Sequence, residues 1–209
     1  MDQVTGVVLL IIILVMSITF HEFMHAYVGF KLGDDTAKLQ GRLSLNPIAH
    51  IDPFLTILMP IMLFLLTGIP IGAAKPVPFN PLRVRYGNLG AALVAVAGPL
   101  TNLGIAAFMS LWLLFVPAAT LASEFLQLFI LVNVAFFVFN MIPFPPLDGS
   151  RVLYAIAPEG LKVLMRQIES FGIFGIVLFI FVLYRFISPL IGGIIEAIVS
   201  LLIPGFRLL

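Results

Sequence analysis

The sequence predicts an all-α polytopic membrane protein, built as a bundle of about five or six membrane segments. Two features of the composition support this fold class. Of the 209 residues, 61% are hydrophobic and only 10% are charged, whereas soluble domains are about 45–50% apolar and about 25% charged. The mean hydropathy is +1.17, and several apolar stretches exceed the roughly 20 residues that a helix needs to cross a hydrocarbon core. A water-soluble globule is therefore excluded.

Four stretches are expected to be spanning helices, namely residues 4–27, 89–116, 121–142 and 171–187. The first lacks the basic start and the small-residue cleavage site of a signal peptide, so we expect it to be retained. A shorter segment at residues 189–203 is expected to begin after the helix-breaking pair Ser188 and Pro189.

The charged residues gather in a few loops. Residues 28–53, 73–88 and 143–170 each contain three lysines or arginines, while the connection at residues 117–120 contains none. The positive-inside rule therefore predicts that the three basic loops are cytoplasmic.

A fifth apolar stretch, residues 54–72, lies between two of these loops and is interrupted by Pro60, Gly68 and Pro70. Because both flanking loops are predicted on one side, we expect this stretch to be re-entrant, with its backbone buried by protein. A plain spanning helix is the alternative, since the length alone fits one.

The charge balance and length set further limits. Eleven basic and ten acidic residues give a net charge of +1, so no nucleic-acid partner is expected. The chain contains no cysteine, which excludes disulfides, thiolate metal sites and a cysteine nucleophile. We expect one domain over residues 1–209, with a core at about 4–155 and C-terminal membrane segments at 171–206.

His21, Glu22 and His25 form a His-Glu-x-x-His pattern near the end of the first apolar stretch. Positions four apart on a helix differ by only about 40° around the axis, so both imidazoles can bind one cation, with Glu22 beside them as a general base. Burying these groups in an apolar helix costs several kcal/mol unless they are paired or bound to a metal. The alternative is that the helix ends here and the residues are hydrated.

A catalytic zinc ion takes three protein ligands and leaves a fourth position for water. Asp148 is the strongest candidate for the third ligand, because it follows the predicted helix at 121–142 and a run of prolines that would end that helix. Gly149 is expected to permit a tight turn beside it. With residues 54–72 re-entrant, His25 and Asp148 lie on the same side of the membrane.

Several other polar residues have more than one interpretation. His50 is a rival metal ligand, a residue that gates the site, or a solvated loop residue. Asn102 and Asn133 are predicted to form interhelical hydrogen bonds. The proline-rich segment at residues 75–81 is either a stiff surface loop or an extended edge along which a substrate strand could pair.

These motifs resemble those of a known family. His-Glu-x-x-His on one membrane helix, followed after another by Asn-x-x-Pro-x-x-x-Leu-Asp-Gly at residues 140–149, resembles the site-2 protease family of intramembrane zinc metalloproteases. Residues 97–102 are similar to that family's third core segment, and the resemblance covers about residues 15–155. It implies a compact bacterial-type member without a PDZ or CBS module.

The resemblance also implies roles for individual residues. His21, His25 and Asp148 would hold one catalytic zinc ion, and Glu22 would be the general base. Asn140 would steady the substrate or the tetrahedral intermediate, with an interhelical hydrogen bond as the alternative role for this residue.

The implied function is an intramembrane zinc endopeptidase. Its partners would be the lipid bilayer and a transmembrane helix of a membrane-protein substrate, and the resemblance suggests a bacterial inner membrane, with the active site towards the cytoplasm. A membrane transporter or metal-handling channel without proteolytic activity is the alternative, although it predicts polar residues recurring along several helices. The sequence predicts no particular oligomeric state.

Overall fold

The computed structural model describes residues 2–50, 77–172 and 184–205. Over these ranges the regular secondary structure is helical, which confirms the predicted fold class. The helices among them that are long and apolar enough to cross a membrane are α1 (Gln3–Lys31), α4 (Gly87–Leu113) and α5 (Leu121–Asn140). They confirm the predicted helices at residues 4–27, 89–116 and 121–142. The predictions for residues 54–72, and for most of 171–187, lie outside the described residues.

The C-terminal segment is longer than predicted. Helix α9 (Tyr184–Leu202) passes through Pro189, so the prediction that this segment begins after Ser188 and Pro189 is wrong. A proline in a helix removes one backbone hydrogen bond and crowds the carbonyl four residues earlier. Ile191 and Val199, which follow Pro189, hold the helix in an apolar cluster with α4 and α5.

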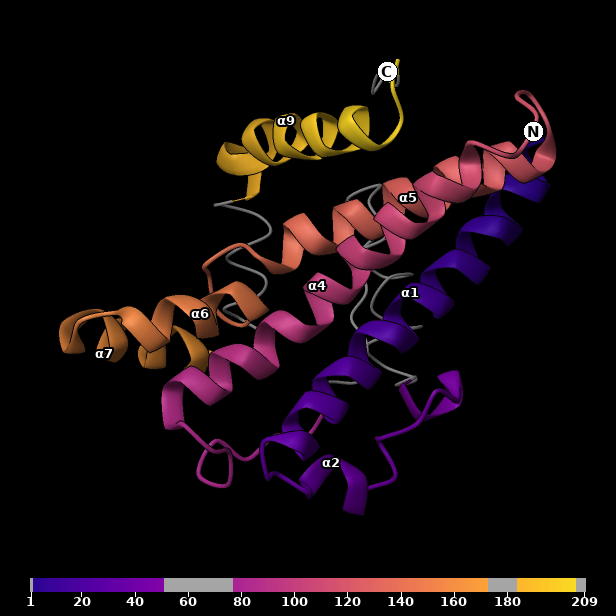
Figure 1. The fold of residues 1–209 in the computed structure, drawn as a ribbon. Helices are drawn as coiled ribbons and strands as arrows, with labels where there is room; N and C mark the ends of the chain where they lie inside the picture. Colours follow the sequence, from indigo (N-terminus) through magenta and orange to yellow (C-terminus); the bar gives the residue numbers. More distant parts are fainter. Residues whose placement is uncertain (1, 51–76, 173–183, 206–209) are drawn as a thin grey trace.

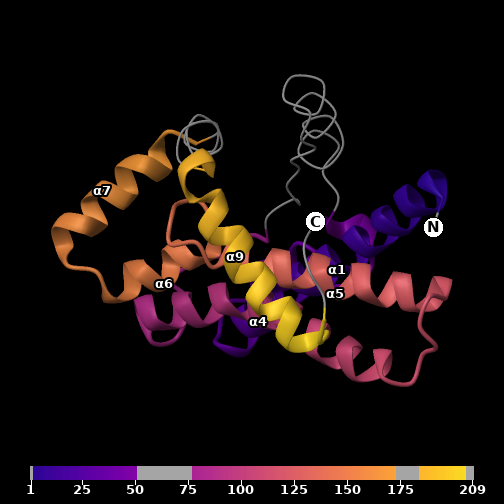
Figure 2. The ribbon, with the colours of Figure 1, turned by 90° about the horizontal axis from the view of Figure 1, so that it is seen from above.

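Helices α1, α4 and α5 pack against one another and form the bundle (Figure 1). Buried small residues on α4, such as Gly90, Ala95 and Gly98, allow its neighbours to approach closely. Ile13 of α1 and Phe129 of α5 form a second apolar cluster between those two helices. Figure 2 shows α9 crossing over the bundle, where it packs mainly on α5.

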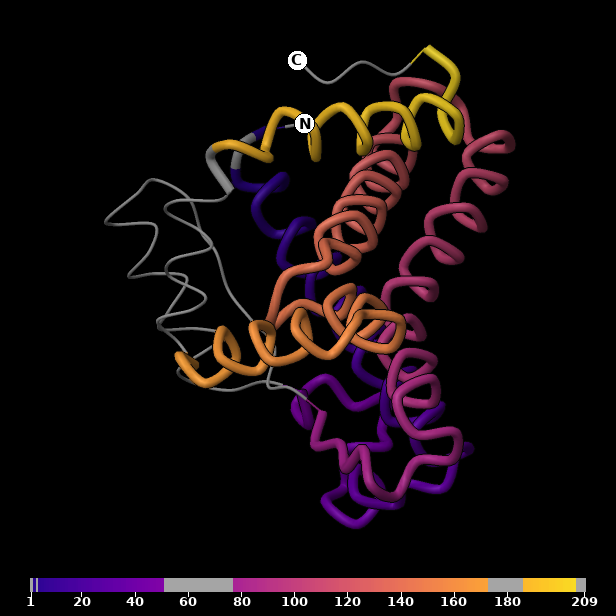
Figure 3. The backbone as a smooth tube through the Cα atoms, turned by 90° about the vertical axis from the view of Figure 1, so that its left-hand side faces the viewer, coloured from indigo at the N-terminus to yellow at the C-terminus, as the bar shows by residue number. Residues whose placement is uncertain are grey.

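Local signals define the helix ends. The Asp2 side chain accepts a hydrogen bond from the Thr5 amide at the start of α1, and Thr120 and Ser123 form a capping box at the start of α5. Helix α5 ends just before the proline-rich connection, as predicted. The chain then turns into α6 (Asp148–Ile156) and α7 (Glu159–Ser170), and α6 packs beside α4 (Figure 3).

The two ends of the bundle differ in character. The N-terminus and the connection between α4 and α5 lie at the same end of the bundle (Figure 1). The opposite end carries α2 (Thr36–Leu39), the short 3-10 helix η1 (Pro47–His50) and residues 77–86. The described parts of the basic loops therefore lie nearer this second end.

Candidate metal centre

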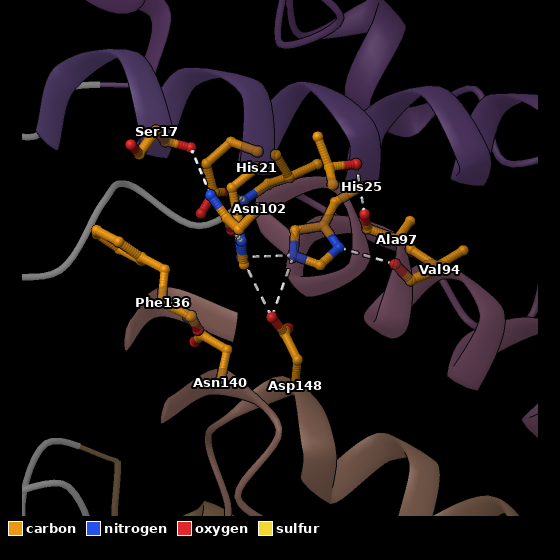
Figure 4. A network of polar contacts seen from close by, with 12 residues as sticks. Ser17, His21, His25, Val94, Ala97, Asn102, Phe136, Asn140 and Asp148 are labelled. Atoms are coloured by element: carbon orange, nitrogen blue, oxygen red, sulfur yellow. Dashed lines mark hydrogen bonds and ion pairs between the residues drawn. The ribbon is translucent and has the colours of Figure 1, made fainter. Parts of the chain in front are cut away.

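Two histidines and one aspartate converge on a single point in the bundle. His21 and His25 lie one turn apart on α1, and both are buried. Their Nε2 atoms are 2.9 Å apart, and each lies 3.2 Å from Oδ2 of Asp148, the first residue of α6 (Figure 4). Among the described residues, these three form the group that could hold a metal ion.

The group lies inside α1 rather than beyond its end. The helix continues for six residues after His25, to Lys31, which is about 9 Å along the axis. The alternative in which the helix ends at the motif and leaves it hydrated is therefore wrong.

Hydrogen bonds on the far side of each ring determine which nitrogen carries the proton. His25 Nδ1 lies 2.8 Å from the Val94 carbonyl oxygen, which can only accept, so Nδ1 is the donor. His21 Nδ1 lies 2.6 Å from Asn102 Oδ1 and donates to it in the same way. In the neutral rings, both Nε2 atoms then present lone pairs to each other and to Asp148.

This donor set fits a zinc ion. Three electron-rich atoms that face one another with no proton between them repel, and a cation at their centre removes the repulsion. Imidazole nitrogen and carboxylate oxygen are ligands that zinc prefers, and metal–ligand distances of about 2.0–2.1 Å in a tetrahedron require ligands about 3.3 Å apart. The observed separations of 2.9 and 3.2 Å are close to that value.

Gly98 makes room for the two rings. A Cβ atom at this position would lie 2.4 Å from His25 Nε2 and 2.8 Å from His21 Cε1. Only glycine allows α4 to approach the histidines this closely.

Asp148 is positioned by the residue that follows it. A Cβ on Gly149 would lie 2.3 Å from the Met141 carbonyl oxygen, so Gly149 lets the start of α6 contact the end of α5. Gly149 does not form the tight turn that we expected, because it is helical and its φ is not positive. Its role is to leave space for the end of α5. Burial raises the pKa of the Asp148 carboxyl. When the adjacent histidines carry a second proton, on Nε2, their charge and hydrogen bonds outweigh burial and hold that pKa well below its usual range.

The Glu22 carboxylate lies among groups from the loops at this end of the bundle. Its Oε2 accepts a hydrogen bond from the Val77 amide at 3.2 Å. Arg42 is buried nearby and donates to the Ala49 carbonyl oxygen. Burial lowers the pKa of the Arg42 guanidinium, and the negative charge of Glu22 opposes that shift.

The other polar candidates are now located. Asn140, in the last turn of α5, lies near Asp148 in Figure 4 and donates to the Phe136 carbonyl oxygen of its own helix at 3.0 Å. This hydrogen bond lies within α5 rather than between helices. His50 is buried and its Nε2 donates to the Ser44 carbonyl oxygen, so it is neither a solvated loop residue nor one of the converging ligands. The predicted interhelical hydrogen bonds of Asn102 and Asn133 are present.

Helix α4 supports this group through contacts that were not predicted. The Val94 carbonyl accepts from His25, and the Asn102 amide oxygen accepts from His21. Gly98, which has no side chain, leaves the space that the two rings occupy. These three residues are spaced four residues apart and so share one face of the helix. A glycine and an asparagine four residues apart on an apolar helix were the sequence signal for this contact.

Comparison with known proteins determines the family. The sequence profile of Peptidase family M50 matches residues 116–183. A protein of Bacillus subtilis (strain 168), named "Putative zinc metalloprotease YwhC", is 42% identical over 191 residues, which cover 87% of this chain and 81% of that protein. The chain belongs to peptidase family M50.

Other relatives of this M50 peptidase carry the same class of name. The Rip2 protein of Mycolicibacterium smegmatis is 30% identical over 66% of the chain and 53% of Rip2. That of Mycobacterium tuberculosis (strain H37Rv) is 28% identical over 85% of the chain and 66% of Rip2. No solved structure matches the chain at a significant level.

These findings confirm the resemblance to site-2 proteases. The chain is a multi-pass membrane metalloprotease whose cofactor is zinc, rather than a transporter or channel.

Proposed function

We propose that this M50 peptidase is an intramembrane endopeptidase, which hydrolyses peptide bonds within or near transmembrane helices of membrane-protein substrates. The observation that carries the proposal is the depth of the histidine–aspartate group. His21 and His25 lie within Val4–Lys31, a helix whose hydropathy suits a membrane span, and Asp148 reaches them from the start of α6. Ionisable groups are costly at such a depth and mark functional sites. A peptide bond cleaved there would belong to a chain that itself enters the bilayer.

In this proposal His21, His25 and Asp148 hold the zinc ion. When bound, zinc supplies Lewis-acid chemistry, because it makes water more acidic and polarises a carbonyl group. The chain's contribution is to supply two neutral imidazoles and one carboxylate already in position. The Val94 carbonyl on α4 helps by keeping the Nε2 lone pair of His25 directed at the site.

Glu22 is proposed as the general base. Its carboxylate would take the proton of the attacking water and then pass it to the leaving amine nitrogen as the peptide bond breaks. The hydrogen bond from the Val77 amide supports this role, because it orients the carboxylate from outside α1. Asn140 is proposed to donate its amide to the carbonyl oxygen of the substrate.

The segment that contacts Glu22 is proposed to align the substrate. Residues 77–80 lie in neither a helix nor a sheet, and their last residue is tied to the end of α1, where the Asn80 amide donates to Asp34 at 2.7 Å. An unwound substrate that paired along this segment would pass the base at Val77. This proposal selects strand pairing over a stiff surface loop.

We further propose a single domain over residues 1–209, with a core at about 4–155 and membrane segments at 171–206. Packing of α9 on α5 supports this division. The basic loops support an active site that faces the cytoplasm, and the bacterial relatives support a bacterial cell membrane.

The test uses the full chain in proteoliposomes with a transmembrane-helix reporter substrate. Glu22→Gln should bind zinc in wild-type stoichiometry and lose about 10²–10⁴-fold in cleavage rate, since the base is lost and the ligands remain. Asp148→Ala should lose both zinc and cleavage. The matched control is Glu124→Gln, a carboxylate in the first turn of α5, which should cleave normally.

Two results would contradict the proposal. Glu22→Gln that cleaves at the wild-type rate would remove the base from the mechanism. Equal cleavage of a soluble peptide with the same scissile sequence would show that the substrate need not be a membrane helix.

A further inference from the structure

Three polar side chains lie in the apolar centre of the bundle, one each from α1, α4 and α5. Ser17 of α1, Asn102 of α4 and Asn133 of α5 are all 0% exposed. Burying an amide or hydroxyl without a hydrogen bond costs about 2–7 kcal/mol, so their partners define how they are held. Asn102 lies between Ser17 and His21 in Figure 4.

The partners of Asn102 fix the orientation of its amide. One end of the amide lies 3.3 Å from the Ser17 carbonyl oxygen and 2.8 Å from Asn133 Oδ1. A carbonyl oxygen can only accept, so the atom that faces it must be Nδ2. The oxygen of the Asn102 amide therefore faces His21.

Asn133 is oriented by the same logic. Its Nδ2 lies 2.9 Å from the Phe129 carbonyl oxygen and 2.9 Å from Ser17 Oγ. This leaves Asn133 Oδ1 to accept from Asn102 Nδ2. Reversing the Asn102 amide would set its oxygen against both the Ser17 carbonyl oxygen and Asn133 Oδ1.

The fixed oxygen determines the tautomer of His21. Asn102 Oδ1 lies 2.6 Å from His21 Nδ1 and can only accept, so Nδ1 holds the proton and Nε2 keeps its lone pair. The tautomer of His25 is fixed in the same way by a backbone carbonyl. Substituting the Val94 side chain would not remove that acceptor. His21 depends on a side chain.

We infer that Asn102 is a positioning residue for the metal centre, which holds His21 in the Nδ1-protonated tautomer and fixes the angle of its ring. This inference rests on the proposed ligand set. Partners behind a ligating histidine typically change metal affinity by about 10–100-fold when they are removed. The Ser17 backbone carbonyl and Asn133 Oδ1 serve this role indirectly, because they orient the Asn102 amide.

The experiment measures zinc affinity of the purified full chain by competition with a chelator. Asn102→Leu, which removes the acceptor, should weaken zinc binding by about 10–100-fold. Asn102→Asp should bind zinc with an affinity close to wild type, because a carboxylate oxygen still accepts from His21 Nδ1. The Asp variant also loses both donor bonds to Ser17 and Asn133, so a purely structural role predicts that it fails as badly as Asn102→Leu.

Ser17→Ala is the matched control. It removes one acceptor of Asn133 and leaves the bond between Asn102 and His21 in place. It should lower the melting temperature of the zinc-free protein and leave zinc affinity near wild type.

A second measurement holds even if a variant folds poorly. Nitrogen-15 NMR of the histidine rings in the zinc-free wild type should show His21 protonated at Nδ1, and Asn102→Leu should give a mixture of tautomers. Wild-type zinc affinity in Asn102→Leu, or a mixed tautomer in the wild type, would overturn the inference. If the wild type itself binds no zinc, the proposed ligand set fails instead.

Discussion

Gly98→Ala places a single methyl group between α4 and the two histidines. Its carbon would lie 2.4 Å from His25 Nε2, 2.7 Å from His25 Cε1 and 2.8 Å from His21 Cε1. Since unstrained contacts begin at about 3.5 Å, the rings or the helix must move by about 1 Å. The His25 ring cannot turn away without losing its 2.8 Å hydrogen bond to the Val94 carbonyl oxygen.

The expected losses follow from that displacement. A shift of about 1 Å in a catalytic group costs about 10²-fold in rate, and overpacking of a tight interior costs about 1–3 kcal/mol. We therefore expect Gly98→Ala to lower the melting temperature, to weaken zinc binding and to reduce cleavage of a transmembrane reporter by about two orders of magnitude. Zinc titration, thermal melting and the proteoliposome assay measure these three quantities.

Gly104→Ala is the control on the same helix. A Cβ there meets nothing within 4 Å, and alanine is favoured over glycine in helices by about 1 kcal/mol. This variant should be at least as stable as wild type and fully active. The reasoning is refuted if Gly98→Ala matches Gly104→Ala in zinc affinity and cleavage.

Two further predictions concern the residues that hold the loops and Asp148. Asp34 is buried and accepts hydrogen bonds from the Asn80 and Thr36 amides. Burial raises the pKa of the Asp34 carboxyl, but these hydrogen bonds outweigh burial and lower that pKa below the ordinary 3.8. A lowered folded-state pKa gives stability that is fully present above pH 3.8 and is lost as the pH falls through the folded value. Melting curves of wild type and Asp34→Asn from pH 3 to 7 should therefore converge only at the acid end, and a constant difference would contradict this account. Gly149→Ala should destabilise the protein by about 1–3 kcal/mol and weaken zinc binding, because the new Cβ meets the Met141 carbonyl oxygen at 2.3 Å. Gly160→Ala in α7, where a Cβ meets nothing within 4 Å, is its control, and equal melting temperatures for the two variants would count against the prediction.

Much of the metal centre was predictable from the sequence. The His-Glu-x-x-His spacing brings two rings to one helix face by local geometry alone. Asp148 required a topological argument, since it is distant in sequence, and the prolines that end α5 supplied the turn. Helical periodicity and the helix-ending effect of proline are both local, so neither depends on how the neighbouring helices pack.

The contribution of α4 was not predictable in the same way. Helices α1, α4 and α5 are apolar nearly all round their circumference, so hydrophobic periodicity does not indicate which face meets which neighbour. The contact between Asn102 and His21 depends on the rotation of one helix against another, which small residues and packing decide. The prediction that a helix begins after Pro189 was wrong for a related reason, because tertiary packing of α9 outweighs a local helix-breaking signal.

The proposed ligands of the metal centre are far apart in the order of synthesis. His21 and His25 arrive with the first helix, whereas Asp148 follows only after α4 and α5 have been made. A nascent chain therefore offers two ligands and no third until α6 docks beside α4, and a two-ligand site holds zinc weakly. Under the proposed ligand set, zinc capture and proteolytic activity are therefore expected only in chains in which α6 has docked.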